Sequence, residues 1–355
     1  MILDSLKVIE KYDKSGMLEL IESFPAQCKD AKRIGERFNL PEGFSKHCKN
    51  IVCLGLGGSA IGADLARSYI ADDAGVPLII NRNYSLPNFV DENTLVIASS
   101  YSGDTEEVLS AYRDARARGC EIIVITSGGK LAKLAKEDKV PCLGIPGGLP
   151  PRCALGYSFF PLLIVLSKIG IIKNQSAAID DAIRLLSSLK NSRLGYKVKH
   201  NDNPAKKIAV QIYGRLPFVY GGADHVDSVV TRWRGQLAEN SKTLASSHIF
   251  PEMNHNEIVG WENPKSILAK SAVIILRDAA DHPRTSRRMD ITKSILKKSK
   301  VKVIEVSSTG RDLLARVFSL IYIGDFVSFY LAILNKVDPT PVDRVTYLKK
   351  ELGKG

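Results

Sequence analysis

The feature that most constrains the fold is a regular alternation of strand-like and helix-like segments. The apolar run NIVCLGLGG (residues 50–58) leads into SAIGADLARSYIAD, and NTLVIASSYSG (residues 93–103) leads into DTEEVLSAYRDARARG. Strands that alternate with helices at short spacing are typical of a parallel sheet with helices on both faces. A chain of 355 residues is too long for one ordinary hydrophobic core and has the length expected of two domains.

The same alternation occurs again in the second half. Residues 208–224 read as a strand and its turn, and HVDSVVTRWRGQLAENSK follows as a helix. We therefore predict an α/β protein with an internal duplication of a doubly wound parallel sheet. The predicted domains are residues 1–172, with N-terminal helices and the first sheet, and residues 205–355, with the second sheet and C-terminal helices; residues 173–204 are a helical connection. In such sheets ligands bind at the carboxyl ends of the strands.

Composition excludes several classes of protein. Hydrophobic content of 45% and charged content of 25% are ordinary for a soluble protein. We expect no membrane span, because no apolar run approaches the roughly 20 residues required. The N-terminus lacks a signal-peptide core, so we expect a cytoplasmic protein. The net charge of +12 is spread along the chain without a nucleic-acid-binding signature, and a small anionic substrate explains it equally well.

The six cysteines all lie in the first half, and none forms a CxxC pair. Several stand in apolar runs. We interpret them as buried free thiols in a reducing compartment, rather than as disulfides or metal ligands.

The first glycine-rich turn matches a loose dinucleotide-binding pattern, Gly-x-Gly-x-x-Ala, over residues 55–60. A dinucleotide site also needs an acid at the end of the next strand, where this chain has Arg82 instead. Arg82 would suit a phosphorylated ribose, so an NADP-dependent oxidoreductase stays as an alternative. Gly58 and Ser59 would in any case allow an anion to approach a helix N-terminus.

The second turn, SSYSGDTEE, carries hydroxyls at Ser100, Ser102 and Thr105 where a strand gives way to a helix. Hydroxyls and unpaired backbone N–H groups at a helix N-terminus form a neutral cradle for a phosphate monoester. The structural alternative is helix capping by Asp104 or Ser102, with Glu107 completing a capping box. Capping accounts for one hydroxyl and leaves the others unexplained.

At this point the chain resembles a known family. SYSGDTEEV and GLGGSAIGADL resemble the phosphosugar loop and first glycine-rich turn of sugar isomerase (SIS) domains. With GGLPPRCALGY, LAENSKTLA, PEMNHNEIVGW and DPTPVDRVTYLKKEL, the chain resembles the bifunctional phosphoglucose/phosphomannose isomerases from about residue 17 to 352. The resemblance implies two flavodoxin-like SIS domains, a sugar phosphate substrate, no cofactor and no metal, and aldose–ketose isomerisation through a cis-enediol.

Isomerisation needs a carboxylate that reaches two adjacent carbons. Glu239 stands near the C-terminal end of a helix, where the dipole disfavours a carboxylate and would raise its pKa, although a solvated helix Glu is the structural alternative. The resemblance assigns Glu239 as the base. Arg152, after two prolines, is either a surface cation or the cation that stabilises the enediolate, and the resemblance favours the latter.

His255 has three interpretations. Its spacing to neighbouring acids matches no typical zinc site, and a His bonded to backbone in a turn is the simplest structural explanation. The resemblance instead implies ring opening, with His255 contributed to the neighbouring active site of a homodimer. It also implies that Lys349, or its neighbour Lys350, assists ring opening. Thr340 is the expected determinant of mannose and glucose 6-phosphate specificity.

A non-catalytic sugar-phosphate regulator is the second hypothesis. It would use the same hydroxyl loop but would not need Glu239, His255 and Arg152 together. Regulators of this kind often carry a DNA-binding module, and the first 50 residues offer no persuasive one.

Overall fold

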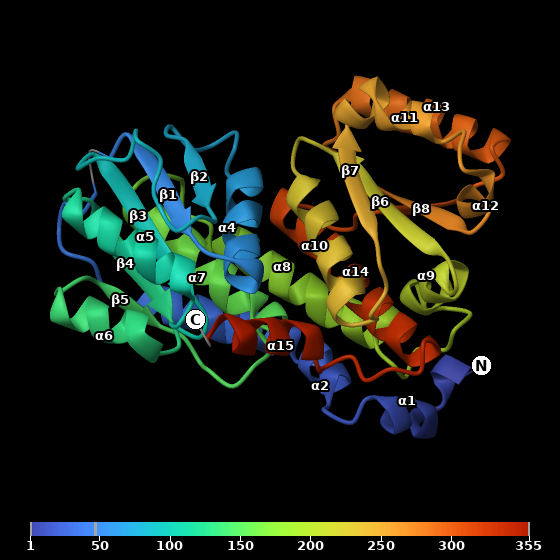
Figure 1. Ribbon diagram of the computed structural model, residues 1–355, viewed down its shortest axis with the longest axis horizontal. Coiled ribbons are helices and arrows are strands. Elements are labelled where there is room, and N and C mark those ends of the chain that lie inside the picture. The colour runs from blue at the N-terminus through green and yellow to red at the C-terminus, as the bar shows by residue number, and fades with distance from the viewer. Residues whose placement is uncertain (1, 46–47, 354–355) are drawn as a thin grey trace. The chain divides into compact units, whose positions relative to one another are not determined.

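The computed structural model describes residues 2–45 and 48–353, which form two compact units, each built on one parallel sheet (Figure 1). The first-sheet unit comprises residues 23–184 and 312–315. The second-sheet unit comprises residues 1–22, 185–311 and 316–355. The domain boundaries at residues 172 and 204 stay predictions.

The first sheet confirms the predicted doubly wound fold. Its strands are β1 (Asn50–Leu54), β2 (Leu78–Asn81), β3 (Thr94–Ser100), β4 (Glu121–Thr126) and β5 (Cys142–Gly144). They are all parallel and lie in the order β2-β1-β3-β4-β5. The chain changes direction across the sheet at β1, so the carboxyl ends of β1 and β3 border the crevice where ligands bind in such folds.

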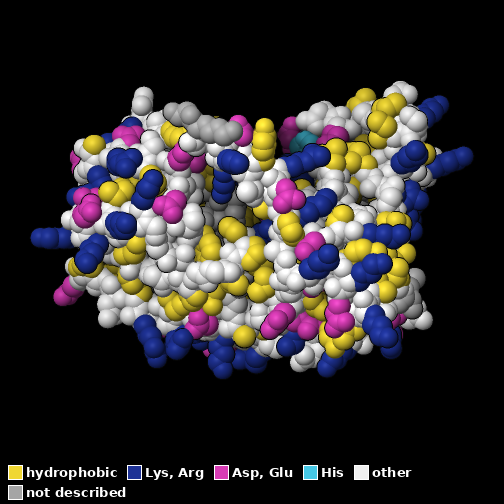
Figure 2. Space-filling model, turned by 60° about the horizontal axis from the view of Figure 1, so that its bottom comes forward, with side chains coloured by type: hydrophobic (Ala, Val, Ile, Leu, Met, Phe, Trp, Pro, Cys, Tyr) yellow, Lys and Arg dark blue, Asp and Glu magenta, His cyan; other side chains and the backbone are white. Residues whose placement is uncertain are grey.

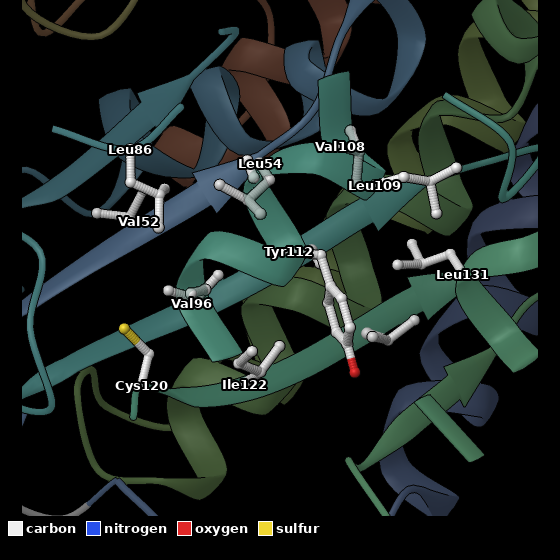
Figure 3. Close-up of a cluster of buried hydrophobic side chains, with 14 of the residues drawn as sticks. Val52, Leu54, Leu86, Val96, Val108, Leu109, Tyr112, Cys120, Ile122 and Leu131 are labelled. Carbon is white, nitrogen blue, oxygen red and sulfur yellow. The ribbon is translucent and has the colours of Figure 1, made fainter. Parts of the chain in front are cut away.

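Helices cover both faces of the first sheet. These helices are α3 (Phe24–Arg37), α4 (Gly57–Tyr69), α5 (Glu106–Ala117), α6 (Gly129–Glu137) and α7 (Leu155–Lys168). Alternate residues of the buried strands point to opposite faces. One set packs under α5 and α6, where Figure 3 shows Tyr112 among Val96, Ile122 and Leu131. On the other face α4 contacts β1, β2 and β3, and α7 packs on α4 and on α3.

The second sheet repeats the arrangement of the first. Its strands are β6 (Leu216–Gly222), β7 (Ser246–Phe250), β8 (Ser271–Arg277) and β9 (Lys302–Ser307). They are parallel and lie in the order β7-β6-β8-β9. If β6 is matched to β1, this is the order of the first four strands of the first sheet, which confirms the predicted duplication. The prediction of a strand and its turn over residues 208–224 is wrong in its first part, because residues 208–212 belong to the helix Pro204–Ile212 and the strand begins at Leu216.

The remaining helices belong mostly to the second-sheet unit or to the connection before it. They are α1 (Leu6–Tyr12), α2 (Met17–Glu22), α8 (Ser176–Leu189), α9 (Pro204–Ile212), α10 (Asp227–Glu239), α11 (Glu257–Gly260), α12 (Lys265–Leu268), α13 (Pro283–Lys298), α14 (Leu313–Leu334) and α15 (Asp343–Leu352). Short 3-10 helices occur at Ile2–Asp4, Pro151–Cys153 and Glu252–His255, and a π-helical turn occurs at Lys190–Leu194.

Helix α14 contradicts the expectation that no segment is long and apolar enough to cross a membrane. It has 22 residues, a mean hydropathy of 2.0, and 89% of its most apolar window is buried inside the protein. Its two internal charges are paired, Arg316 with Asp278 and Asp325 with Arg232. Burial of this extent is typical of the core helix of a soluble protein, which passes the same test of length and composition.

All six cysteines are free, as predicted, but burial holds for only some of them. Cys28, Cys53 and Cys120 are buried, and burial raises the pKa of the Cys53 and Cys120 thiols. Cys142 is exposed, so the prediction that all six are buried is wrong. It lies in β5, an edge strand in which only the central residue is buried.

The charged side chains follow the dispersed pattern seen in the sequence. Figure 2 shows Lys and Arg side chains with Asp and Glu among them on the face in view.

Candidate active site

The turn between β1 and α4 is shaped by glycines. Gly57 has a φ of +50°, a left-handed conformation that glycine adopts without strain. A Cβ at Gly58 would lie 2.6 Å from the carbonyl oxygen of Pro151, so only glycine allows this close approach. Ser59, in the first turn of α4, is buried, and its Oγ accepts a hydrogen bond from the N–H of Tyr101 at 3.0 Å. The two predicted anion-binding turns are therefore in contact.

The loop between β3 and α5, residues 100–105, is held by its own hydroxyls. The Oγ of Ser100 lies 2.8 Å from the Oγ1 of Thr105 and accepts a hydrogen bond from the N–H of Gly103 at 3.1 Å. Ser100 is buried, Thr105 is partly buried and Ser102 is exposed. The loop thus presents Ser102 and Thr105 outward on a rigid base.

Gly103 and Gly129 allow this loop to pack closely against the turn that follows β4. Gly103 has a φ of +75°, and a Cβ on it would lie 1.8 Å from the carbonyl oxygen of Gly128. A Cβ on Gly129 would in turn lie 2.4 Å from the carbonyl oxygen of Ser102. Backbone packs directly on backbone here. The sequence signal was the Gly-Gly pair after β4, which sequence reasoning did not use.

The structure corrects the capping interpretation of this loop. The N-cap of α5 is Thr105, and its side chain makes no capping hydrogen bond. Asp104 does not cap α5, because its Oδ1 accepts a hydrogen bond from the N–H of Lys130 at 3.1 Å, in the first turn of α6. The N-terminus of α5 therefore lacks a side-chain cap within the described residues and directs its first N–H groups to the space above the loop.

Arg152 lies beside these turns and is not a surface residue. It occupies the 3-10 helix Pro151–Cys153, and only 4% of it is exposed, which contradicts the surface interpretation. A narrow crevice joins the three segments. It is lined by Gly58, Ser59, Ser99, Tyr101, Ile145, Pro151, Ala154 and Ser158. The first-sheet unit thus gathers both glycine turns, the hydroxyl loop and the Arg152 segment at the carboxyl edge of its sheet.

Glu239 is the last residue of α10, as predicted, and it is partly buried. The turn that follows it is tied to a distant segment. The Nζ of Lys242 donates hydrogen bonds to the carbonyl oxygen of Glu239 at 2.6 Å and to that of Pro339 at 3.1 Å. Pro339 directly precedes Thr340. The second-sheet unit therefore brings the Glu239 turn and the Thr340 segment together, a proximity that the sequence did not reveal.

His255 ends the 3-10 helix Glu252–His255 and is exposed. Over residues 2–45 and 48–353 its ring takes part in no hydrogen bond, so the simple interpretation of a His bonded to backbone is wrong. Within residues 2–45 and 48–353, no group of three or more His, Cys, Asp or Glu side chains could hold a metal ion.

His255 and Glu239 of one chain lie at opposite edges of the second sheet. Helix α10 links the parallel strands β6 and β7, so it begins at the carboxyl edge and ends, with Glu239, at the amino edge. His255 follows β7, whose arrowhead in Figure 1 points toward α11 at the carboxyl edge. The 13 residues of α10 span about 20 Å at 1.5 Å per residue.

Lys349 and Lys350 lie on α15, where both are exposed. Neither forms an ion pair within the described chain, and the structure does not distinguish between them. Arg82, which would have to hold the ribose phosphate of NADP, instead forms an ion pair with Asp64 of α4. That pairing weakens the dinucleotide alternative, because the cation on which it depended is already partnered by a carboxylate.

Comparisons with known proteins point to one family. A family model described as the SIS domain matches residues 46–145, and one described as the bacterial phospho-glucose isomerase C-terminal SIS domain matches residues 201–352. The chain is similar to a bifunctional phosphoglucose/phosphomannose isomerase of Caldicellulosiruptor bescii, with 45% identity over 95% of this chain and 98% of the relative. A protein of the same name from Aquifex aeolicus is 39% identical over 86% of this chain and 91% of its own length.

A solved structure supports the fold. The C-terminal domain of glucosamine-fructose-6-phosphate aminotransferase from Francisella tularensis aligns with a TM-score of 0.70 over 92% of this chain and 98% of its own. At 14% identity, that likeness concerns the fold alone.

Proposed function

Because the chain belongs to the family of bifunctional phosphoglucose/phosphomannose isomerases, we propose that it interconverts glucose 6-phosphate and mannose 6-phosphate with fructose 6-phosphate. The observation that carries this proposal is the similarity along nearly the whole chain, joined to a neutral hydroxyl loop at a helix N-terminus. That loop has the chemistry of a phosphate monoester site.

The phosphate of the sugar binds at residues 100–105. Ser102 and Thr105 offer hydroxyls, and the first N–H groups of α5 offer backbone donors aligned with the helix dipole. Gly58 and Ser59 adjoin this loop, because the Oγ of Ser59 accepts a hydrogen bond from the N–H of Tyr101. The buried Ser100 keeps the loop in shape through its bonds to Thr105 and Gly103.

Proton transfer is assigned to Glu239. Its carboxylate removes the proton from C2 of the aldose, and the C1 carbonyl oxygen takes up a proton from a second acid to become the second hydroxyl of a cis-enediol. The carboxyl group, whose proton exchanges with water in the meantime, then delivers a proton to C1 while the C2 hydroxyl gives up its own proton and becomes the ketone, so no oxidant or reductant is consumed. Arg152 supplies a permanent positive charge that stabilises the enediolate.

Ring opening requires a second acid and base, which we assign to His255 with Lys349. An imidazole suits this step because its ordinary pKa lies close to neutrality. His255 cannot serve the Glu239 of its own chain if both act at one site, since the two lie at opposite edges of the second sheet. This separation supports a homodimer in which His255 completes the neighbouring site.

We assign to Thr340 the ability of the enzyme to act on both glucose 6-phosphate and mannose 6-phosphate. To yield both epimers at C2, the enediol must rotate about its C2–C3 bond, which needs room and a hydroxyl partner. The position of Thr340 next to the Glu239 turn supports this role. The six free cysteines support a reducing, cytoplasmic setting for the enzyme.

A coupled assay tests the proposal directly. Purified protein is incubated with fructose 6-phosphate in the presence of a metal chelator, and glucose 6-phosphate and mannose 6-phosphate are measured separately. We expect both products. If folded protein binds fructose 6-phosphate but forms neither product, the chain is a sugar-phosphate-binding regulator and the enzyme assignment is wrong.

A further inference from the structure

A buried polar seam joins α10 to α14. The Nη2 of Arg232 lies 3.0 and 2.9 Å from the two carboxylate oxygens of Asp325, and the Nε2 of Gln236 donates to the same carboxylate at 2.8 Å. Directly after the end of α10, the Nδ2 of its C-cap residue Asn240 donates to the Oγ of Ser328 at 2.9 Å. Arg232, Gln236 and Asn240 stand four residues apart, so they form one stripe along α10 and its C-cap.

The two helices are also in close contact at this seam. A Cβ on Gly324 would lie 2.4 Å from the Nε1 of Trp233, which donates to the carbonyl oxygen of Leu320 at 2.8 Å. Glycine on α14 therefore lets the indole lie against the helix backbone. The seam fixes the position of α10 along its length, and Glu239 is its last residue.

Beyond the end of α10 the seam closes in a clasp, formed by Asn335 with residues 241 and 243. The Nδ2 of Asn335, the residue after α14, donates to the carbonyl oxygen of Ser241 at 2.8 Å and to the Oγ1 of Thr243 at 3.0 Å. The N–H of Thr243 donates back to the carbonyl oxygen of Leu237 at 3.2 Å. A single amide thus holds the turn that follows Glu239.

Lys242 makes a second link between the turn that follows α10 and the segment that follows α14. Its Nζ bonds the carbonyl oxygens of Glu239 and Pro339, at 2.6 and 3.1 Å. Lys242 itself has a φ of +55°, a left-handed conformation that is uncommon for a non-glycine residue. Glu239, which is assigned to proton transfer, and Thr340, which is assigned to substrate breadth, therefore lie on two neighbouring segments. The bonds of Asn335 and those of Lys242 join these segments.

We propose that Asn335 is a positioning residue that sets the ratio of mannose 6-phosphate to glucose 6-phosphate. The inference rests on the proposed function of Glu239 and Thr340. Both epimers come from one enediol, and they differ only in which face of C2 receives the proton. The clasp fixes the position of the Glu239 carboxylate relative to the Thr340 segment. It therefore determines how often each face of C2 receives the proton. Small displacements matter, because a shift of about 1 Å can change a rate by about 100-fold.

The test uses the ratio of the two products formed from fructose 6-phosphate in one reaction at early times. Asn335→Ala and Asn335→Asp remove the amide donors, and Lys242→Gln removes the second link. Lys336→Ala is the matched control, because Lys336 is the next residue, exposed, and outside the clasp. The product ratio does not depend on how much of a variant is folded, so a loss of stability alone leaves it unchanged.

We expect the ratio to change at least threefold in both Asn335 variants and in the same direction in Lys242→Gln, with KM for fructose 6-phosphate within about twofold of the parent, because the phosphate loop lies in the first-sheet unit. Lys336→Ala should keep the parent ratio. An unchanged ratio in active Asn335→Ala would overturn the positioning role alone. A parent protein that forms neither product would instead contradict the proposed function.

Discussion

The Oγ of Ser59 accepts a hydrogen bond from the N–H of Tyr101 at 3.0 Å, and this bond joins the turn after β1 to the loop after β3. The two strands are neighbours in the sheet, so their carboxyl ends meet at one edge. A hydroxyl that accepts one hydrogen bond can still donate its own hydrogen. Ser59 can therefore brace the loop and contact a phosphate at the same time.

Substitution of Ser59 by Ala should weaken both functions. The partly buried N–H of Tyr101 would lose its acceptor, which costs about 1 kcal/mol in the free energy of unfolding. With the loop less well fixed, KM for fructose 6-phosphate should rise about tenfold while kcat falls less. The control is Ser110→Ala on α5, whose side chain makes no hydrogen bond within the described chain. Equal KM values for Ser59→Ala, Ser110→Ala and the parent would show that Ser59 does not shape the site.

Substitution of Gly103 by Ala should disrupt the loop of residues 100–105, because this loop packs directly on the backbone of Gly128. The new Cβ would meet the carbonyl oxygen of Gly128 at 1.8 Å, at a φ of +75° that disfavours any side chain. Backbone would have to move, and we expect a loss of at least about 3 kcal/mol in stability together with loss of fructose 6-phosphate binding. Gly75→Ala is the control, since no atom lies within 4 Å of its Cβ position. Urea unfolding and calorimetric titration measure both effects, and parent-like binding by Gly103→Ala would refute the packing argument.

A buried acid in the second-sheet unit should make stability depend on pH. Burial raises the pKa of Asp281 to about 6, and the nearby carboxylates of Asp278 and Asp224 add to the rise. Between about pH 4 and pH 6 the folded state holds a proton that the unfolded state has released, so stability should fall as pH rises through this window. The full effect is about 3 kcal/mol, from roughly two pKa units.

Asp281→Asn tests that dependence. The amide oxygen can still accept the hydrogen bond from the N–H of Asp278, which the carboxylate accepts at 2.8 Å. We expect the variant to be more stable than the parent by about 1–2 kcal/mol at pH 8 and to lose that advantage near pH 4. Urea unfolding at both pH values measures it. A variant that is less stable than the parent at pH 8 would mean that the charged form of Asp281 is stabilised in the fold.

Mixing two inactive variants tests whether the site is shared between subunits. Glu239→Gln and His255→Ala should each be inactive alone. With random subunit exchange half of the dimers are mixed, and each mixed dimer has one site with both groups intact if His255 crosses to the neighbour. The mixture should then regain about one quarter of the parent activity. No recovery despite exchange verified by mass spectrometry would place His255 and Glu239 in the same subunit's site.

Much of the fold could be predicted from the sequence because its determinants are local. Apolar runs such as residues 94–100 alternate with amphipathic helices, and strands in that arrangement pair in parallel. The glycine turn and the hydroxyl loop lie at strand–helix junctions, so their place at the carboxyl edge of the first sheet also followed from the pattern.

The features that sequence reasoning missed depend on contacts between distant segments. The burial of Arg152, the ion pair of Arg82 with Asp64 and the bond of Asp104 to α6 each require the folded chain. The clasp of Asn335 on residues 241 and 243 joins segments more than 90 residues apart. Helix α14 was misjudged because its charges, which interrupt the apolar run in the sequence, are neutralised by partners in the core.

The most direct measurement of the central claim is deuterium incorporation from D2O during turnover of fructose 6-phosphate. A carboxylate that carries the proton exchanges it with solvent, so the parent should place deuterium at C2 of glucose 6-phosphate. Glu239→Gln should still bind fructose 6-phosphate but should lose turnover and deuterium incorporation by at least about 100-fold, whereas Glu10→Gln should match the parent. If Glu239→Gln incorporates deuterium at the parent rate, Glu239 is not the base.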